Sequence, residues 1–279
     1  MTEFFDIEGG RIAYDVAGEG PLIVLSHGLG DRRQAYRFVV PELVRAGFRV
    51  AAADMRGHGE SSPGAWKSIS RTDVAGDLIA LIRHLGGGPA VIVGHSLSGG
   101  SATIAAATAP ELVSGIVEIG PFTKKVEYSL GGLVRNRRYR SATLAMTGVL
   151  LLRSLDMWMR YLDVAYPEKP ADYDAYMAGL RAKLSEPGRK DEFLKTLKTS
   201  PADAAAQLPH VSCPALVIMG LEDPDFADPR AEADAIVAAM PAGTGAVKLL
   251  KGAGHYPHAQ CPDQIAGLII GFLRERVRA

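Results

Sequence analysis

Short runs of apolar residues recur along the whole chain and are separated by polar or glycine-rich segments. Two early runs alternate apolar and polar positions on either side of Gly9 and Gly10, which predicts an antiparallel hairpin at a sheet edge. The later runs are almost continuously apolar, as in parallel strands that are covered on both faces. The predicted strands are residues 4–8, 11–17, 22–27, 48–54, 90–95, 115–120, 215–220 and 246–252.

Segments with helical periodicity lie between the later strands. The clearest helix start precedes residues 72–86, because Ser70 or Thr72 is suited to cap a helix and Asp73 follows in the first turn. The other predicted helices are residues 34–47, residues 98–110 and a terminal helix at 261–277 with Pro262 near its first turn. This alternation predicts right-handed crossovers and a doubly wound, mainly parallel sheet, whose ligands bind beyond the carboxyl ends of the strands.

One long segment, residues 122–209, interrupts the alternation. It contains no convincing strand, but it has several helix-like pieces that are separated by glycine and proline. Because a single loop of this length is unusual in a folded domain, the segment is interpreted as a helical lid (cap) packed over the end of the sheet. Residues 1–121 and 210–279 then form the core domain.

Composition and charge exclude several classes of function. The chain has 31 basic and 31 acidic residues, so no nucleic-acid or membrane partner is predicted. It has neither an apolar run of the roughly 20 residues that a membrane helix needs nor a secretory signal pattern. Cys213 and Cys261 lack metal-site spacing and are interpreted as structural thiols, which favours a cytoplasmic location. No cofactor or metal is predicted, and a homodimer is compatible with the sequence, which does not determine the oligomeric state.

The stretch VIVGHSLSGGSA, residues 91–102, carries the first candidate for chemistry. Its letters GHSL fit four positions of G-x-S-x-G, the pattern of a nucleophile on a sharp strand-to-helix turn, but the fifth position is Ser98. The alternative is an ordinary glycine- and serine-rich loop. Because Ser98 is small and a glycine follows it, the steric demand of the turn is still met, and Ser96 is the candidate nucleophile.

A serine hydroxyl becomes a nucleophile when a base takes its proton. His255 follows the last predicted strand in a glycine-rich loop and is the candidate base, whereas His258 is interpreted as a supporting or surface histidine. Activity is expected to fall as His255 is protonated, with a midpoint near the ordinary histidine pKa of about 6.5.

The imidazole needs an acid that fixes its tautomer. Asp223, just after the strand at 215–220, is the candidate. Glu222, Asp225 and Asp228 compete with it, and Asp225 is the most serious alternative. The candidates occur in the order serine, aspartate, histidine along the chain.

Backbone N–H groups that face a developing oxyanion complete the chemistry. The candidates are Leu29, in the loop after the strand at 22–27, and Leu97, which follows the nucleophile. His27 is interpreted as a turn-stabilising residue that borders the substrate pocket, and not as the base.

Methionine and aromatic residues are concentrated between residues 141 and 177. Such side chains suit an apolar acyl pocket, although packing of the lid onto the core is the favoured role for most of them. The candidate pocket residues are Trp158, Met157 and Tyr161.

Two polar segments are interpreted as structural. The basic run at Lys124, Lys125 and residues 135–140 is interpreted as a solvated outer face, so an anionic substrate is not predicted. The segment ADMRGHGESS, residues 53–62, lacks the lysine and hydroxyl pair of a phosphate-binding loop, and its glycines are assigned to backbone geometry.

The motifs SHGLG, ADMRGHGESS, GHSLSGG, GLEDPDF and GAGHYPHAQCP, in this order, resemble the α/β-hydrolase superfamily over nearly the whole chain. The lidded esterase and haloperoxidase-like branch is the most similar one. The resemblance implies an eight-stranded, mostly parallel sheet with helices on both faces and a helical lid. It also implies Ser96 as nucleophile, His255 as general base and Asp223 as acid. A serine at position 96 argues against the dehalogenase and epoxide hydrolase branches, whose nucleophile is an aspartate.

The predicted function is hydrolysis of a small or medium carboxylic ester, thioester or lactone through an acyl-enzyme, with a small-molecule acyl substrate as the partner. Alternatives with the same residues are a cofactor-free perhydrolase or haloperoxidase and a carbon–carbon bond hydrolase. An alternative of another class is a small-molecule receptor with little turnover, because a fold does not determine a function.

Overall fold

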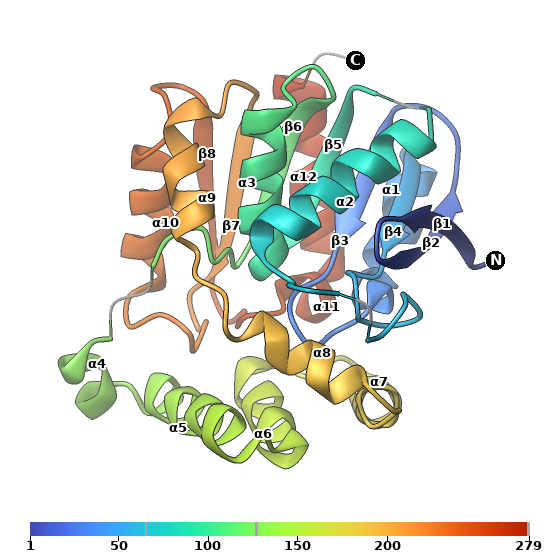
Figure 1. Ribbon diagram of the computed structural model, residues 1–279. Coiled ribbons are helices and arrows are strands. Elements are labelled where there is room, and N and C mark those ends of the chain that lie inside the picture. The colour runs from blue at the N-terminus through green and yellow to red at the C-terminus, as the bar shows by residue number, and fades with distance from the viewer. Residues whose placement is uncertain (65, 87, 126–127, 278–279) are drawn as a thin grey trace.

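The computed structural model describes residues 1–64, 66–86, 88–125 and 128–277. These residues form a sheet with the strand order β1-β2-β4-β3-β5-β6-β7-β8 (Figure 1). The strands are β1 (Glu3–Ile7), β2 (Gly10–Ala17), β3 (Leu22–Ser26), β4 (Arg49–Ala53), β5 (Ala90–His95), β6 (Val113–Ile119), β7 (Ala215–Gly220) and β8 (Gly245–Leu250). β2 is antiparallel to both β1 and β4, and all other neighbours are parallel. The predicted fold class and edge hairpin are confirmed.

Helices cover both faces of the sheet because its central strands are apolar on both sides. Successive residues of a strand point to opposite faces: Val24 and Ile92 pack in one core cluster, whereas Leu25 and Val93 pack in the other. The first cluster is covered by α2 (Arg71–His84), α3 (Leu97–Thr108) and α10 (Pro229–Ala238), and the second by α1 (Val39–Arg45) and α12 (Pro262–Arg276).

Helix starts follow the local sequence. The Ser70 side chain accepts a hydrogen bond from the backbone N–H of Asp73, and the Asp73 carboxylate accepts one from the backbone N–H of Ser70. Ser70 is therefore the cap of α2 and Thr72 is not. The helix predicted at 34–47 is divided into η1 (Arg33–Tyr36) and α1. Pro41 explains the later start of α1, because proline lacks an N–H group and is tolerated in the first turn but not in the interior of a helix.

The segment between β6 and β7 is helical throughout most of its described length. Its elements are α4 (Leu130–Arg135), α5 (Arg137–Leu152), α6 (Leu155–Ala165), α7 (Tyr173–Leu184), α8 (Arg189–Thr196), α9 (Ala202–Gln207) and η2 (Leu208–His210). In Figure 1, α4 to α8 lie together below the sheet, whereas α9 lies beside it. Ala204 of α9 is buried in the core cluster with α3, so core packing extends into this segment.

The boundaries of the two predicted domains stay a prediction, and positions 65, 87, 126, 127, 278 and 279 of those ranges lie outside the described residues. The short helix α11 (Pro257–Gln260) precedes α12. Within the described ranges, no helix has both the length and the apolar character required to cross a bilayer.

Candidate active site

Ser96 lies at the sharp turn between β5 and α3. Its φ of 55° and ψ of −117° are outside the common conformations of residues with a side chain. The close approach of the two elements requires a glycine at position 94, because a Cβ there would lie 2.1 Å from the carbonyl oxygen of Ser98. The backbone N–H of Ser96 donates to the carbonyl of Ile119 at 2.9 Å, which fixes the turn against β6.

Ser98 occupies the position at which the motif has a glycine. Its hydroxyl donates to the carbonyl oxygen of His27 at 2.6 Å and lies 2.9 Å from the hydroxyl of Ser26. The side chain is fully buried. The additional hydroxyl is therefore accommodated by hydrogen bonds to β3 and to the loop that follows it.

His255 lies in the loop after β8, between two carboxylates. Its Nδ1 atom is 2.8 Å from Asp223 Oδ2 and 3.4 Å from Asp225 Oδ2. Burial lowers the pKa of His255, but Asp223 and Asp225 outweigh burial and raise it to about 9. The expectation of an ordinary histidine pKa is thus revised upward.

The two carboxylates have different partners. Asp223 accepts the hydrogen bond of His255 and also the backbone N–H of Asp225 at 3.0 Å. Asp225 accepts the hydroxyl of Tyr161, on α6, at 2.5 Å, and burial raises its pKa to about 6. Asp223 therefore has the geometry of the orienting acid, whereas Asp225 connects the histidine to the helical segment.

These three residues also have the spacing of a metal site, since one ligand atom of each lies within 4.8 Å of the others. Hydrogen bonds account for that spacing: each carboxylate accepts at least one donor from the protein. No contact of these groups points specifically to a metal.

Ser96 and His255 line a common cavity of about 430 Å³ beneath the helical segment. Among the hydrogen bonds of the described residues, none joins the Ser96 hydroxyl to His255. Such bonds are often long in a free enzyme and shorten when substrate binds. The wall also includes Leu29, Leu97, Phe122, Tyr139, Met146, Trp158, Tyr161 and Tyr256.

Leu29 and Leu97, the candidate oxyanion donors, both contribute to this wall. Leu97 is the first residue of α3, where a backbone N–H has no acceptor within its own helix. The loop with Leu29 passes close to Ser96, since a Cβ on Gly28 would lie 2.8 Å from the Cβ of Ser96.

Of the candidate pocket residues, the structure places Trp158 and Tyr161 in the cavity wall and Met157 and His27 outside it. The rings of Trp158 and Tyr161 are stacked 4.9 Å apart. Met157 packs instead against α5, where a Cβ on Gly148 would lie 2.5 Å from its methyl group.

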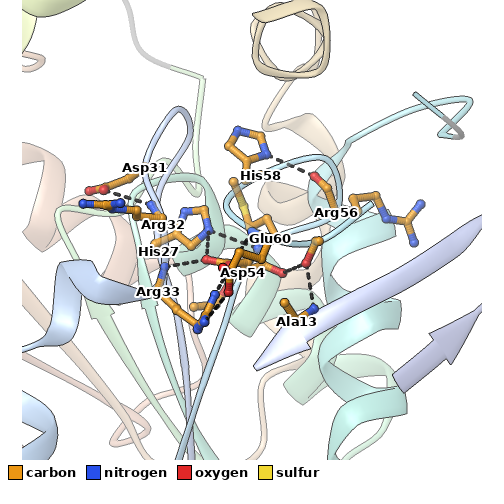
Figure 2. Close-up of polar contacts among 12 residues, drawn as sticks. Ala13, His27, Asp31, Arg32, Arg33, Asp54, Arg56, His58 and Glu60 are labelled. Carbon is orange, nitrogen blue, oxygen red and sulfur yellow. Dashed lines mark hydrogen bonds and ion pairs between the residues drawn. The ribbon is translucent and has the colours of Figure 1, made fainter. Parts of the chain in front are cut away.

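His27 lies beside Asp54 in the cluster of polar residues in Figure 2. Its Nδ1 donates to the carbonyl of Gly28 at 2.7 Å, and its Nε2 accepts the N–H of Met55 at 3.0 Å. Burial lowers the pKa of His27 to about 4, so the ring is neutral. Both ring nitrogens are occupied by the backbone, in agreement with a turn-stabilising role and with the position of His27 outside the cavity wall.

Asp54 is the centre of the cluster in Figure 2, and its carboxylate pairs with the guanidinium of Arg33. It also accepts the backbone N–H groups of Arg33 at 2.7 Å and Glu60 at 2.8 Å. These contacts tie the loop after β4 to the loop after β3, in agreement with a structural role for residues 53–62.

Two residues that the sequence analysis did not single out support the site. His95 precedes Ser96, is fully buried, and its Nε2 lies 2.8 Å from the carbonyl oxygen of His255. Burial holds the pKa of His95 well below its usual value, so the neutral ring donates this bond and positions His255. Its place next to Ser96 in the motif was the available signal. The second residue, Arg71, lies in the cavity wall.

His258 is buried and not on the surface. Its ring lies 4.5 Å from that of His95 and 4.9 Å from that of Tyr36. It therefore packs behind the residue that positions His255.

Comparisons with known proteins agree with the fold and the motifs. The model of the alpha/beta hydrolase family matches residues 23–268. The chain belongs to this family.

The chain is 29% identical over 227 residues to a 2-(acetamidomethylene)succinate hydrolase of Mesorhizobium japonicum, covering 77% of this chain and 76% of that protein. It is 34% identical over 116 residues to epoxide hydrolase B of Mycobacterium tuberculosis, covering 41% of this chain and 33% of that protein. The solved esterase of Exiguobacterium antarcticum has a TM-score of 0.78 at 17% identity and covers 99% of this chain and 100% of that one.

Proposed function

We propose that this protein is a serine hydrolase that cleaves carboxylic esters, thioesters or lactones through an acyl-enzyme. One observation carries the proposal: Ser96 occupies a strained turn in the wall of the same cavity as His255, whose Nδ1 lies 2.8 Å from Asp223. A nucleophile, a base and an orienting acid are the three groups that acyl transfer requires.

In the proposed reaction, Ser96 Oγ forms a bond to the acyl carbon while its proton passes to Nε2 of His255. The N–H groups of Leu29 and Leu97 stabilise the oxyanion. When the tetrahedral intermediate collapses, the alcohol or thiol leaves with the proton from His255. Water then attacks the acyl-enzyme, gives a proton to His255, and the acid is released as Ser96 recovers its proton.

Asp223 is proposed as the orienting acid, because it receives the shorter contact from His255. Asp225 adds a second negative charge near the imidazolium that forms during the reaction. The aromatic and methionine side chains of the cavity suit an apolar acyl or alcohol group.

The similarity to known hydrolases supports a hydrolytic reaction. The serine at position 96 supports acyl transfer as the type of hydrolysis. The named relatives are a 2-(acetamidomethylene)succinate hydrolase and an epoxide hydrolase. The match to the epoxide hydrolase covers only part of each chain. Epoxide hydrolysis is not part of this proposal, because position 96 is a serine and not the aspartate expected of that branch.

Labelling with a fluorophosphonate, located by peptide mass spectrometry, tests the proposal. The label is expected on Ser96 in the wild type and in Ser98→Ala, and it is expected to be absent in Ser96→Ala. Ester turnover by Ser96→Ala should fall by about 10³-fold or more at unchanged folding. Near-full turnover by this variant would refute the assignment, and ligand binding without turnover would favour a receptor.

A further inference from the structure

Arg71 is a buried cation in the wall of the cavity that contains Ser96. It is the first residue of α2 and is only 5% exposed. Its stem packs on α3, where a Cβ on Gly100 would lie 2.7 Å from Arg71 Cδ. The guanidinium is therefore held by packing and cannot extend into solvent.

The hydrogen bonds of this guanidinium are incomplete. Nε donates to the carbonyl of Phe122 at 2.7 Å, whereas Nη1 is buried and has no acceptor among the described residues. Within the described ranges, no carboxylate forms an ion pair with Arg71. Asp203 acts on it only at longer range and instead accepts a bond from Thr72.

This position is unfavourable for a cation that has only a structural role. A buried donor without an acceptor costs about 1–3 kcal/mol, and a positive charge in the first turn opposes the helix dipole. Burial lowers the pKa of Arg71 to about 10, so the group is still charged at neutral pH. An anion that enters the cavity would relieve both penalties.

Arg71 is linked to the nucleophile through a single residue. The N–H of Phe122 donates to the carbonyl oxygen of Ser96 at 3.1 Å, and the carbonyl of Phe122 accepts the bond from Arg71. Gly100, which contacts the Arg71 stem, lies one turn along α3 from Ser96, a rise of about 6 Å. A substrate that reaches from Ser96 to Arg71 would therefore have roughly three to five covalent bonds between its reacting carbonyl and its anionic group.

Two other polar residues of the cavity wall differ from Arg71 in charge or in exposure. Trp158 Nε1 is also a buried donor without an acceptor, but it is neutral. Lys125 contributes to the wall from an exposed position, where solvent screens its charge. Arg71 is thus a desolvated positive charge within a largely apolar lining, and unlike His255 it has no carboxylate ion pair among the described residues.

We propose that Arg71 binds a carboxylate on the acyl part of the substrate, so that the preferred substrates are half-esters of short dicarboxylic acids. Planar guanidinium groups suit carboxylates because two N–H groups can bind both oxygens. The proposal rests on the proposed esterase function, which it deepens by adding a substrate class. It also revises the expectation that the substrate is not anionic.

Kinetics with a matched substrate pair test this role. The pair is monoethyl glutarate and ethyl 5-methylhexanoate, in which an isopropyl group replaces the carboxylate, and release of ethanol is measured. Wild type should favour the glutarate ester. In Arg71→Met the ratio of the two kcat/KM values should fall by about 10- to 100-fold, whereas Arg71→Lys should restore part of it. Arg140→Met, an exposed arginine of α5 outside the cavity, should leave the ratio unchanged.

Calorimetric binding separates this proposal from the esterase proposal. Ser96→Ala protein should bind monoethyl glutarate, and addition of Arg71→Met should weaken this binding by a similar factor. If neither ester is hydrolysed but this binding difference holds, the anion site stands and the esterase assignment fails. An unchanged substrate ratio in Arg71→Met, or equal binding in both Ser96→Ala backgrounds, would overturn the role of Arg71.

Discussion

Arg33 and Arg71 are both buried, at 4% and 5% exposure, but their surroundings are opposite. The Arg33 guanidinium donates to Glu60 at 2.7 Å and also to Asp54, both in the cluster of Figure 2. It also donates to Asp15 at 2.7 Å. Arg71 donates to one neutral carbonyl. The first arginine has carboxylate partners within the protein and joins loops, whereas the second retains binding capacity for a ligand.

The carboxylates of the two regions differ in the same way. Asp54 is fully buried and accepts the backbone N–H groups of Arg33 and Glu60 in addition to the Arg33 guanidinium. Asp225, in the cavity wall, accepts one tyrosine hydroxyl and lies 3.4 Å from His255. Satisfied charges hold together the loops after β3 and β4, whereas incompletely satisfied charges lie in the wall of the cavity, as is common at functional sites.

Arg33→Met should produce the largest effect. It leaves Asp54 buried without its cation, so the free energy of unfolding is expected to fall by about 3–5 kcal/mol, measured by urea denaturation. The matched control is Arg45→Met, which removes an exposed pair with Glu42 and should change stability by less than about 1 kcal/mol. A similarly small loss for Arg33→Met would show that the contacts of Arg33 with Asp54 contribute little to the stability of the fold.

Asp225→Asn should shift the pH dependence of catalysis. The base acts only when His255 is neutral, so kcat/KM is expected to rise as pH increases through its pKa, which lies near 9. Removing the negative charge of Asp225 destabilises the imidazolium, so the midpoint should move to lower pH by about one unit.

The pH profile of Asp228→Asn provides the control for this shift. Asp228 caps α10 through the N–H of Ala231 and is not part of the cavity wall. An unchanged midpoint in Asp225→Asn would show that only Asp223 acts on His255.

Ser98→Ala tests the connection between the two regions. It removes the bond to the carbonyl of His27 and the contact with Ser26, so the free energy of unfolding should fall by about 1 kcal/mol. Because the Ser96 turn is held separately by its bond to Ile119, kcat/KM for ethyl 5-methylhexanoate should change by less than about threefold. A loss of 100-fold would show that Ser98 maintains the nucleophile's geometry.

Local patterns sufficed for the sheet and the Ser96 turn. Continuous apolar runs such as residues 90–95 identify strands that are covered on both faces, and the cap of α2 is encoded within four residues. Such local patterns could not predict which carboxylate pairs with His255. Asp223 and Asp225 differ by two positions, and their distances to His255 depend on how the loops after β7 and β8 meet.

It is still harder to predict from sequence that a buried charged side chain lacks an oppositely charged partner. Arg71 begins a helix in the segment SISRTD, where an arginine has the pattern of an ordinary solvated residue. Only packing against Gly100 and the distance from any carboxylate make it unusual. The same holds for His27, whose pocket role was expected from its place in the chain, but whose ring nitrogens are both used by the backbone.

Arg71→Met should have the smallest effect on stability and the opposite sign to Arg33→Met. The substitution keeps the buried stem, removes an unpaired charge and loses one bond to Phe122, so the free energy of unfolding should stay equal or rise by about 1 kcal/mol. Urea denaturation in the Ser96→Ala background, with monoethyl glutarate present, sharpens the test, since the bound anion should stabilise Ser96→Ala more than the variant that also carries Arg71→Met. A loss above about 2 kcal/mol without ligand would place Arg71 in the same structural category as Arg33, because only a cation that the fold itself satisfies is costly to remove.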